Sequence, residues 1–99
     1  MTDDIFKNKC VYASKLVENP QAHLEWEEVM HLVEVVTSIF KHTELNKDKS
    51  YPEFELFLAD FTSFIKCKKQ RGKFKDVYYS NRYNKNKMNQ GLTSLLSIG

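Results

Sequence analysis

Apolar residues recur every three or four positions between residues 24 and 40, and this spacing predicts an amphipathic helix. One apolar stripe of the segment comprises Trp26, Val29, Met30, Val33, Val36 and Phe40. A second set extends that stripe around the helix: Leu32, Val35, Val36 and Ile39. Because so wide an apolar surface needs neighbours on more than one side, we place this helix at the centre of a small bundle.

The segment before it predicts another helix, which begins after Thr2 as a capping residue and ends near Glu18. Its apolar face comprises Phe6, Cys10, Ala13 and Val17. Asn19 followed by Pro20 is a typical helix start, so the second helix is expected to run from Pro20 to about His42.

A third helix is predicted after residues 50–53, because Ser-Tyr-Pro-Glu matches a capping box. Its apolar side comprises Phe54, Phe57, Leu58, Phe61, Phe64 and Ile65. The pattern fades at Lys68, and Gly72 is the expected stop. A fourth helix is predicted from Phe74 to about Tyr83. Three of its residues are expected to be buried: Phe74, Val77 and Tyr78.

The whole chain of 99 residues is expected to form one all-α domain of three to four helices. Only three glycines and two prolines are present, and this scarcity argues against a turn-rich β fold. The apolar tail, residues 91–99, is either flexible or folded back on the bundle. Gln90 and the spaced leucines after it loosely resemble peptides that dock onto sliding clamps, although the usual aromatic residue of such peptides is absent.

Charge divides the chain into two parts. Residues 1–65 contain 12 acidic and 6 basic residues, whereas residues 66–99 contain 9 basic residues and 1 acidic residue. This asymmetry predicts either an end that binds a polyanion or attraction between the two parts. The abundance of Lys, Asn and Tyr is also typical of an A+T-rich gene, which is a simpler explanation of the same residues.

The basic segment, residues 66–87, is the main functional candidate. Its cations can neutralise phosphates, and its exposed tyrosines can stack on unpaired bases. The candidate phosphate contacts are Lys66, Lys68, Lys69, Arg71, Lys73, Lys75, Arg82, Lys85 and Lys87, and the candidate stacking residues are Tyr79 and Tyr83. Gln70 is a candidate for polar contacts to bases or backbone. In the alternative interpretation the aromatic residues are core and the cations only solubilise a helix end.

The sequence predicts no catalytic activity, no metal site and no cofactor. Neither cysteine has a nearby histidine to generate a thiolate, and the glycines form no phosphate-binding loop. Di-iron bundles need the Glu-x-x-His pair twice, and this chain has it once, at Glu28 and His31. His23, Glu27 and His31 share helical spacing, but polar residues of an exposed face are far commoner than metal ligands at such a spacing.

These patterns favour a small, non-catalytic protein that binds DNA or RNA as an accessory or regulatory factor. The alternative is a protein-binding regulator or inhibitor that acts, or self-associates, through a face of the second helix. Small size and composition are typical of phage or mobile-element proteins. No apolar run approaches the roughly 18 residues of a membrane span, and two unpaired cysteines suit the cytoplasm.

Overall fold

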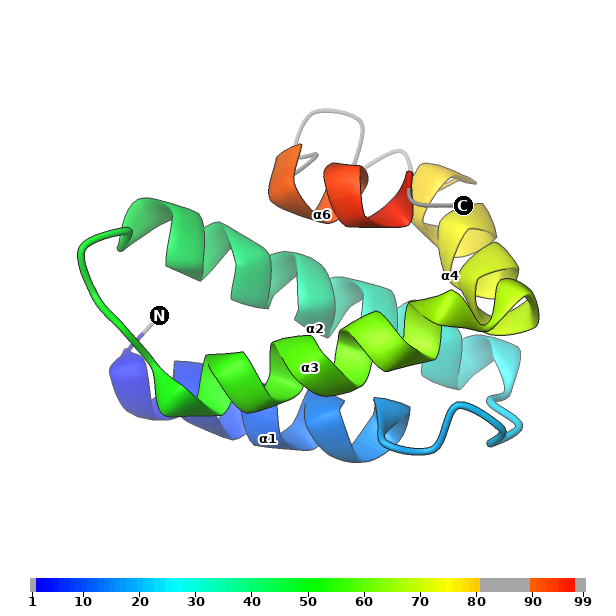
Figure 1. Cartoon of the computed structure of the whole chain (residues 1–99), viewed down its shortest axis with the longest axis horizontal. Helices are drawn as coiled ribbons and strands as arrows, with labels where there is room; N and C mark the ends of the chain where they lie inside the picture. The colour runs from blue at the N-terminus through cyan, green and yellow to red at the C-terminus, as the bar shows by residue number, and fades with distance from the viewer. Residues whose placement is uncertain (1, 81–89, 98–99) are drawn as a thin grey trace.

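The computed structural model describes residues 2–80 and 90–97, which form five helices and contain no strand (Figure 1). The helices are α1 (Asp3–Val17), α2 (Trp26–Leu45), α3 (Pro52–Lys66), α4 (Lys68–Ser80) and α6 (Gln90–Leu96). The prediction of an all-α bundle is confirmed, although the described helices number five rather than three or four. No helix of these two ranges has the length and apolar character that a membrane span requires.

The first helix forms where the pattern predicts it. Thr2 caps α1, because its side-chain oxygen accepts a hydrogen bond from the Ile5 N–H at 3.3 Å. The predicted apolar face is completely buried: Phe6, Cys10, Ala13 and Val17. Most contacts of α1 are with α3, where the Ser14 hydroxyl donates a hydrogen bond to the Asp60 carboxylate.

The predicted start of the second helix at Pro20 is wrong. The Asn19 side chain accepts a hydrogen bond from the Gln21 N–H at 3.0 Å, and the Asn19 carbonyl accepts one from the Ala22 N–H at 3.0 Å. These two bonds make a turn rather than a first helical turn. A capping box between Glu25 and Glu28 starts α2 instead.

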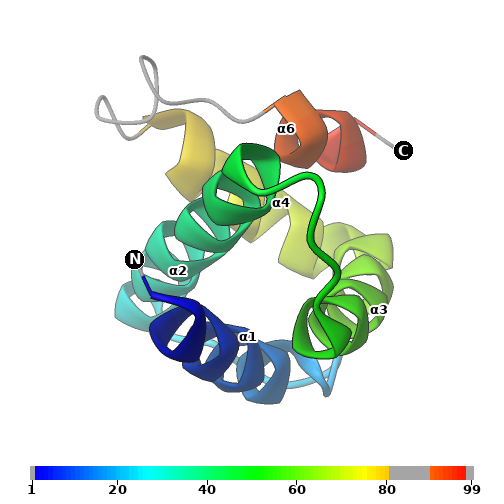
Figure 2. The same ribbon diagram turned by 90° about the vertical axis from the view of Figure 1, so that its left-hand side faces the viewer.

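Four helices follow one another around the core. End-on, α1, α2, α4 and α3 surround a shared interior, and α6 lies against α2 (Figure 2). The buried side of α2 includes most of the predicted stripe, at Val29, Leu32, Val33, Val35, Val36, Ile39 and Phe40. Trp26 and Met30 are exceptions, because 56% and 43% of their surface is exposed. These two residues of the apolar stripe therefore lie outside the core.

A row of aromatic rings fills much of the interior. Phe57 stacks on Phe61 with ring centroids 5.5 Å apart, and Phe61 meets Phe74 edge-to-face at 5.3 Å. Phe74 in turn stacks on Tyr78 at 6.3 Å. The row joins α3 to α4. Phe74 and Tyr78, which belong to the basic segment, are therefore part of the core.

The boundary between the third and fourth helices also differs from the prediction. Helix α3 ends at Lys66, and its C-cap residue is Cys67, whose backbone is extended (φ −72°, ψ 115°) and whose N–H donates to the Phe64 carbonyl at 3.2 Å. Helix α4 therefore begins at Lys68, and Gly72 lies inside it instead of ending α3. Phe74, Val77 and Tyr78 are buried, as predicted.

Candidate nucleic-acid interface

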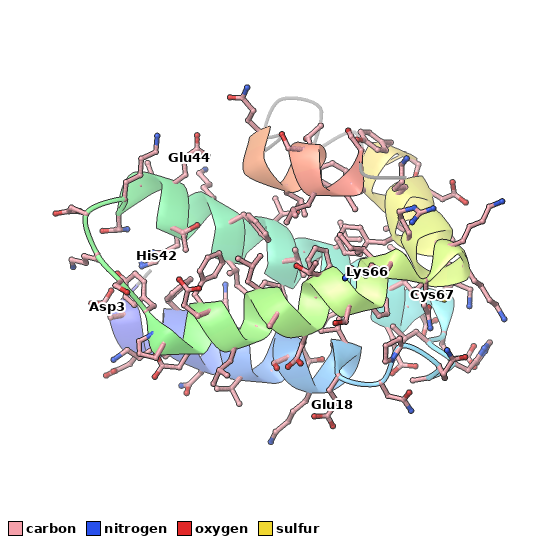
Figure 3. The ribbon with its side chains drawn as sticks, in the orientation of Figure 1. Asp3, Glu18, His42, Glu44, Lys66 and Cys67 are labelled. Carbon is pink, nitrogen blue, oxygen red and sulfur yellow. The ribbon has the colours of Figure 1, made fainter. Side chains whose placement is uncertain are left out.

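The corner between α3 and α4 gathers the positive charge. Lys66 is the last residue of α3, and Lys68 and Lys69 open α4 directly after Cys67. All three lysine side chains are exposed. Figure 3 shows Lys66 and Cys67 at this corner, where the two helices meet. The change of direction at Cys67 thus brings the end of one helix and the start of the next together at the surface.

Helical spacing divides the lysines of α4 into two strips, which lie outside the buried side of the helix. Lys68, Gly72 and Lys75 are separated by four and three residues and form the first strip. Lys69 and Lys73 are four residues apart and form the second. Lys73 and Lys75 are half-buried, as expected for long aliphatic stems that lie along the surface.

Two members of the predicted interface serve the fold instead. The Arg71 guanidinium donates a hydrogen bond to the Ile65 carbonyl at 3.1 Å and so satisfies the carboxyl end of α3. Gln70 is only 5% exposed, and its side-chain amide donates to the carbonyls of Pro20 at 3.1 Å and Ala22 at 2.6 Å. Gln70 therefore attaches α4 to the connection before α2, and its predicted contact with bases is wrong.

Tyr79 is held against the bundle. Its ring meets Tyr78 edge-to-face with centroids 5.0 Å apart, and it packs on the core while remaining half-buried. One part of the ring is therefore accessible to a ligand. The other predicted residues, Arg82, Tyr83, Lys85 and Lys87, lie outside the described residues.

The lysines of the corner have no carboxylate partner among the residues that the structure describes. Within residues 2–80 and 90–97, the ion pairs are His23 with Glu25, and Asp3 with both His42 and Lys49. None involves a lysine of α4 or Lys66. The acidic part of the chain thus does not neutralise the described cations of the basic segment.

A polar cluster at the opposite end of the bundle has a structural role. The Tyr51 hydroxyl donates to the Asp3 carboxylate at 3.1 Å, and His42 Nε2 lies 3.5 Å from the same oxygen. Figure 3 shows Asp3 and His42 near the start of α1. The hydrogen bond from Tyr51 is the largest influence on the pKa of Asp3 and lowers it. Desolvation opposes this effect, and the nearby Lys49 and His42 each lower the pKa further by smaller amounts. The cluster holds the start of α1 to the connection between α2 and α3.

The considered metal ligands are not assembled. His23 precedes α2 rather than continuing its helical spacing, and it pairs with Glu25 at 3.4 Å. His31 meets Tyr12 edge-to-face at 5.4 Å. The part of the chain that the structure describes contains no group of three or more His, Cys, Asp or Glu side chains able to hold a metal ion.

The interaction face expected on the second helix could not be assigned to particular residues from the sequence. Trp26 and Met30 are one helical turn apart on α2 and belong by spacing to the predicted apolar stripe. Hydrophobicity alone could not separate them from their buried neighbours. The only local signal in the sequence is the neighbourhood of these two residues. Three charged residues lie close to them at the start of α2: Glu25, Glu27 and Glu28.

No protein-family model, curated protein sequence or solved structure matches this chain. Two surfaces of the described residues are candidates for a function, the α3–α4 corner and the outer face of α2. Among the described residues, the α3–α4 corner carries cations without carboxylate partners. The outer face of α2 carries exposed apolar side chains.

Proposed function

We propose that this protein binds nucleic acid through Lys68 and Lys75 of α4 and acts as a small, non-catalytic accessory or regulatory factor. One observation carries the proposal. Lys68 and Lys75 flank Gly72 on one face of α4, and neither pairs with a carboxylate among the described residues. Positive charge that the fold leaves without a partner is suited to an external polyanion.

The spacing of this strip suits a phosphate backbone. Residues seven positions apart on a helix are separated by about 10 Å along its axis, so Lys68 and Lys75 can reach different phosphates. A Cβ atom added at Gly72 would meet nothing within 4 Å, and the helix backbone between the two lysines is consequently open to close approach. Such contacts position a nucleic acid without reading its sequence.

Fluorescence anisotropy with labelled single-stranded and duplex DNA and RNA, across a salt series, tests the proposal. The logarithm of the affinity should fall linearly with the logarithm of the salt concentration, by about 0.9 per phosphate contact on a duplex and about 0.7 on a single strand. Lys68→Glu with Lys75→Glu should weaken binding on the order of tenfold or more.

The matched control is Lys41→Glu with Lys47→Glu, which changes the net charge equally at two exposed lysines far from the corner in sequence. If both double variants lose the same amount of affinity for nucleic acid, the loss is caused by the change in net charge alone. That result would contradict a defined interface. Absence of binding even at low salt would refute the proposal.

The second candidate function is that of a protein-binding regulator, and the exposure of Trp26 and Met30 favours it. An interface built on buried apolar surface resists salt, whereas phosphate contacts weaken steeply with it. A partner retained from an extract at high salt and lost on Trp26→Ser would support this candidate. Nucleic acid that is released from the protein as the salt concentration rises would support the first candidate, nucleic-acid binding.

A further inference from the structure

The outer face of α2 near its start combines apolar and acidic side chains. Trp26 and Met30 are exposed to 56% and 43%, and Glu27 and Glu34 lie beside them on the same exposed side. Neither of these carboxylates has an ion-pair partner in residues 2–80 and 90–97. Apolar side chains bordered by free charges of one sign are typical of a surface that receives a complementary surface. We call Trp26, Glu27, Met30 and Glu34 the acidic α2 face.

The second strip of α4 has the opposite charge and lies beside the start of α2. Lys69 and Lys73 line the same small depression as His23, which precedes α2 by three residues. Helices α2 and α4 also contact each other directly. The Lys69–Lys73 strip therefore lies beside the connection that leads into α2, and the described residues form no ion pair between this strip and the acidic α2 face.

We propose that two copies of this chain associate with the acidic α2 face of each copy against the Lys69–Lys73 strip of the other. A surface that carries a negative and apolar part beside a positive part becomes self-complementary after a two-fold rotation. Both contacts then form at once, and the assembly closes as a dimer rather than growing into a filament. The proposal does not rest on nucleic-acid binding, because the strip assigned to phosphates is the other one, Lys68 and Lys75.

Charge complementarity is what selects a second copy as the occupant. The part of the chain that contains α2 has an excess of acidic residues, and the part that contains α4 has an excess of basic residues. Two copies in antiparallel orientation bring these opposite charges together twice. The apolar pair, Trp26 and Met30, then supplies buried surface at the centre of the contact, where aromatic residues contribute most to association.

Sedimentation velocity on the full chain, over a range of protein concentrations, tests the proposal. At low salt we expect a concentration-dependent dimer, which dissociates at least tenfold more readily when the ionic strength is raised to about 0.5 M, where charges are strongly screened. Trp26→Ser should also weaken the dimer at least tenfold. A chain that stays monomeric at low salt would overturn the proposal and assign the acidic α2 face to a different partner.

Charge exchange makes the test specific. Glu27→Lys with Glu34→Lys gives a chain whose two surfaces are both positive, and Lys69→Glu with Lys73→Glu gives one whose surfaces are both negative. Each double variant alone should be monomeric, and an equimolar mixture of the two should recover the dimer. A mixture that remains monomeric, or a double variant that still dimerises as the natural chain does, would overturn the proposal.

Circular dichroism provides the folding control for every variant, because all five substituted positions lie on helices. Trp26→Ser should leave the affinity for nucleic acid unchanged, since Trp26 is not part of the phosphate strip. The experiments therefore distinguish a chain that does not dimerise from a chain that does not bind nucleic acid.

Discussion

Gly72 is an interior helical residue that has no evident structural need to be glycine. Glycine in a helix interior costs about 0.5–1 kcal/mol relative to alanine. The site has open space for a side chain, so Gly72→Ala should raise the free energy of unfolding by about that amount. Urea denaturation measures the change. A loss of stability would contradict the helical environment described for this position.

Gly72 also connects stability with the proposed interface. If a phosphate backbone approaches α4 closely between Lys68 and Lys75, a large side chain at position 72 should reduce nucleic-acid affinity while the fold is retained. Gly72→Leu is the informative change, and Gly72→Ala is its small matched control.

Asp3 should make stability depend on pH in the acid range. Its pKa is lowered from 3.8 in the folded state, chiefly by the hydrogen bond from Tyr51. A lowered carboxyl pKa contributes stability above the unfolded pKa, and this contribution is lost as pH falls through the folded pKa. We therefore expect Asp3→Asn to destabilise the protein at neutral pH and to make less difference as pH falls below about 4. Denaturation curves at several pH values measure this dependence.

Asp4→Asn is the matched control for this experiment. Asp4 lies in the same first turn of α1 and experiences the same helix dipole, but no hydrogen bond from Tyr51 is formed to it. The same pH profile in both variants would assign the effect to the dipole instead of the cluster.

At the scale of the elements, the sequence predicts helices better than their ends. The buried face and the start of α1 are predicted correctly, because every third or fourth residue is apolar and Thr2 caps the helix. Asn19–Pro20 suits a turn and a helix start equally, and the choice depends on Gln70, which is 50 positions away and binds the Pro20 carbonyl. Such a long-range contact has no local signal.

The stop at Gly72 fails for a related reason. Glycine is a common helix terminator, but the carboxyl end of α3 is satisfied by Arg71 and by the Cys67 N–H, so no glycine is needed. The same contacts explain why the candidate interface was only partly predictable. Composition identifies a basic segment, whereas the rotation of α4 decides that Lys68 faces solvent and Arg71 faces α3.

The last described helix is expected to be an integral part of the core. Leu92 in α6 is completely buried, whereas Leu95 is only half-buried. Leu92→Ala should lower the free energy of unfolding by about 2–5 kcal/mol, the usual cost of removing a buried leucine side chain. Leu95→Ala is the matched control and should cost less. Equal, small effects in thermal or urea denaturation would mean that α6 docks only weakly.

At the scale of the whole molecule, Cys10 reports on global opening. It is buried against α3, and burial raises the pKa of its thiol to about 12. Cys67 is partly exposed at the α3–α4 corner. We expect Ellman's reagent to modify one thiol of the native protein quickly and the second only on unfolding, because the thiolate is the reactive form.

Cys67→Ser should remove the fast reaction and leave the slow one. Its rate would then follow the population of open molecules. Rapid modification of both thiols in the natural chain would contradict the burial of Cys10.

The pairing of α1 with α3 has a consequence for the way the chain is made. The two helices begin 49 positions apart in the sequence, at Asp3 and Pro52, and yet α3 provides most of the contacts of α1. At typical translation rates, roughly 3–10 s pass between the synthesis of α1 and that of α3. During this interval the apolar face of the nascent α1 has no native partner, and Phe6 and Val17 are available to chaperones at the ribosome. The apolar face of the nascent helix must then be kept from aggregation until α3 has been made.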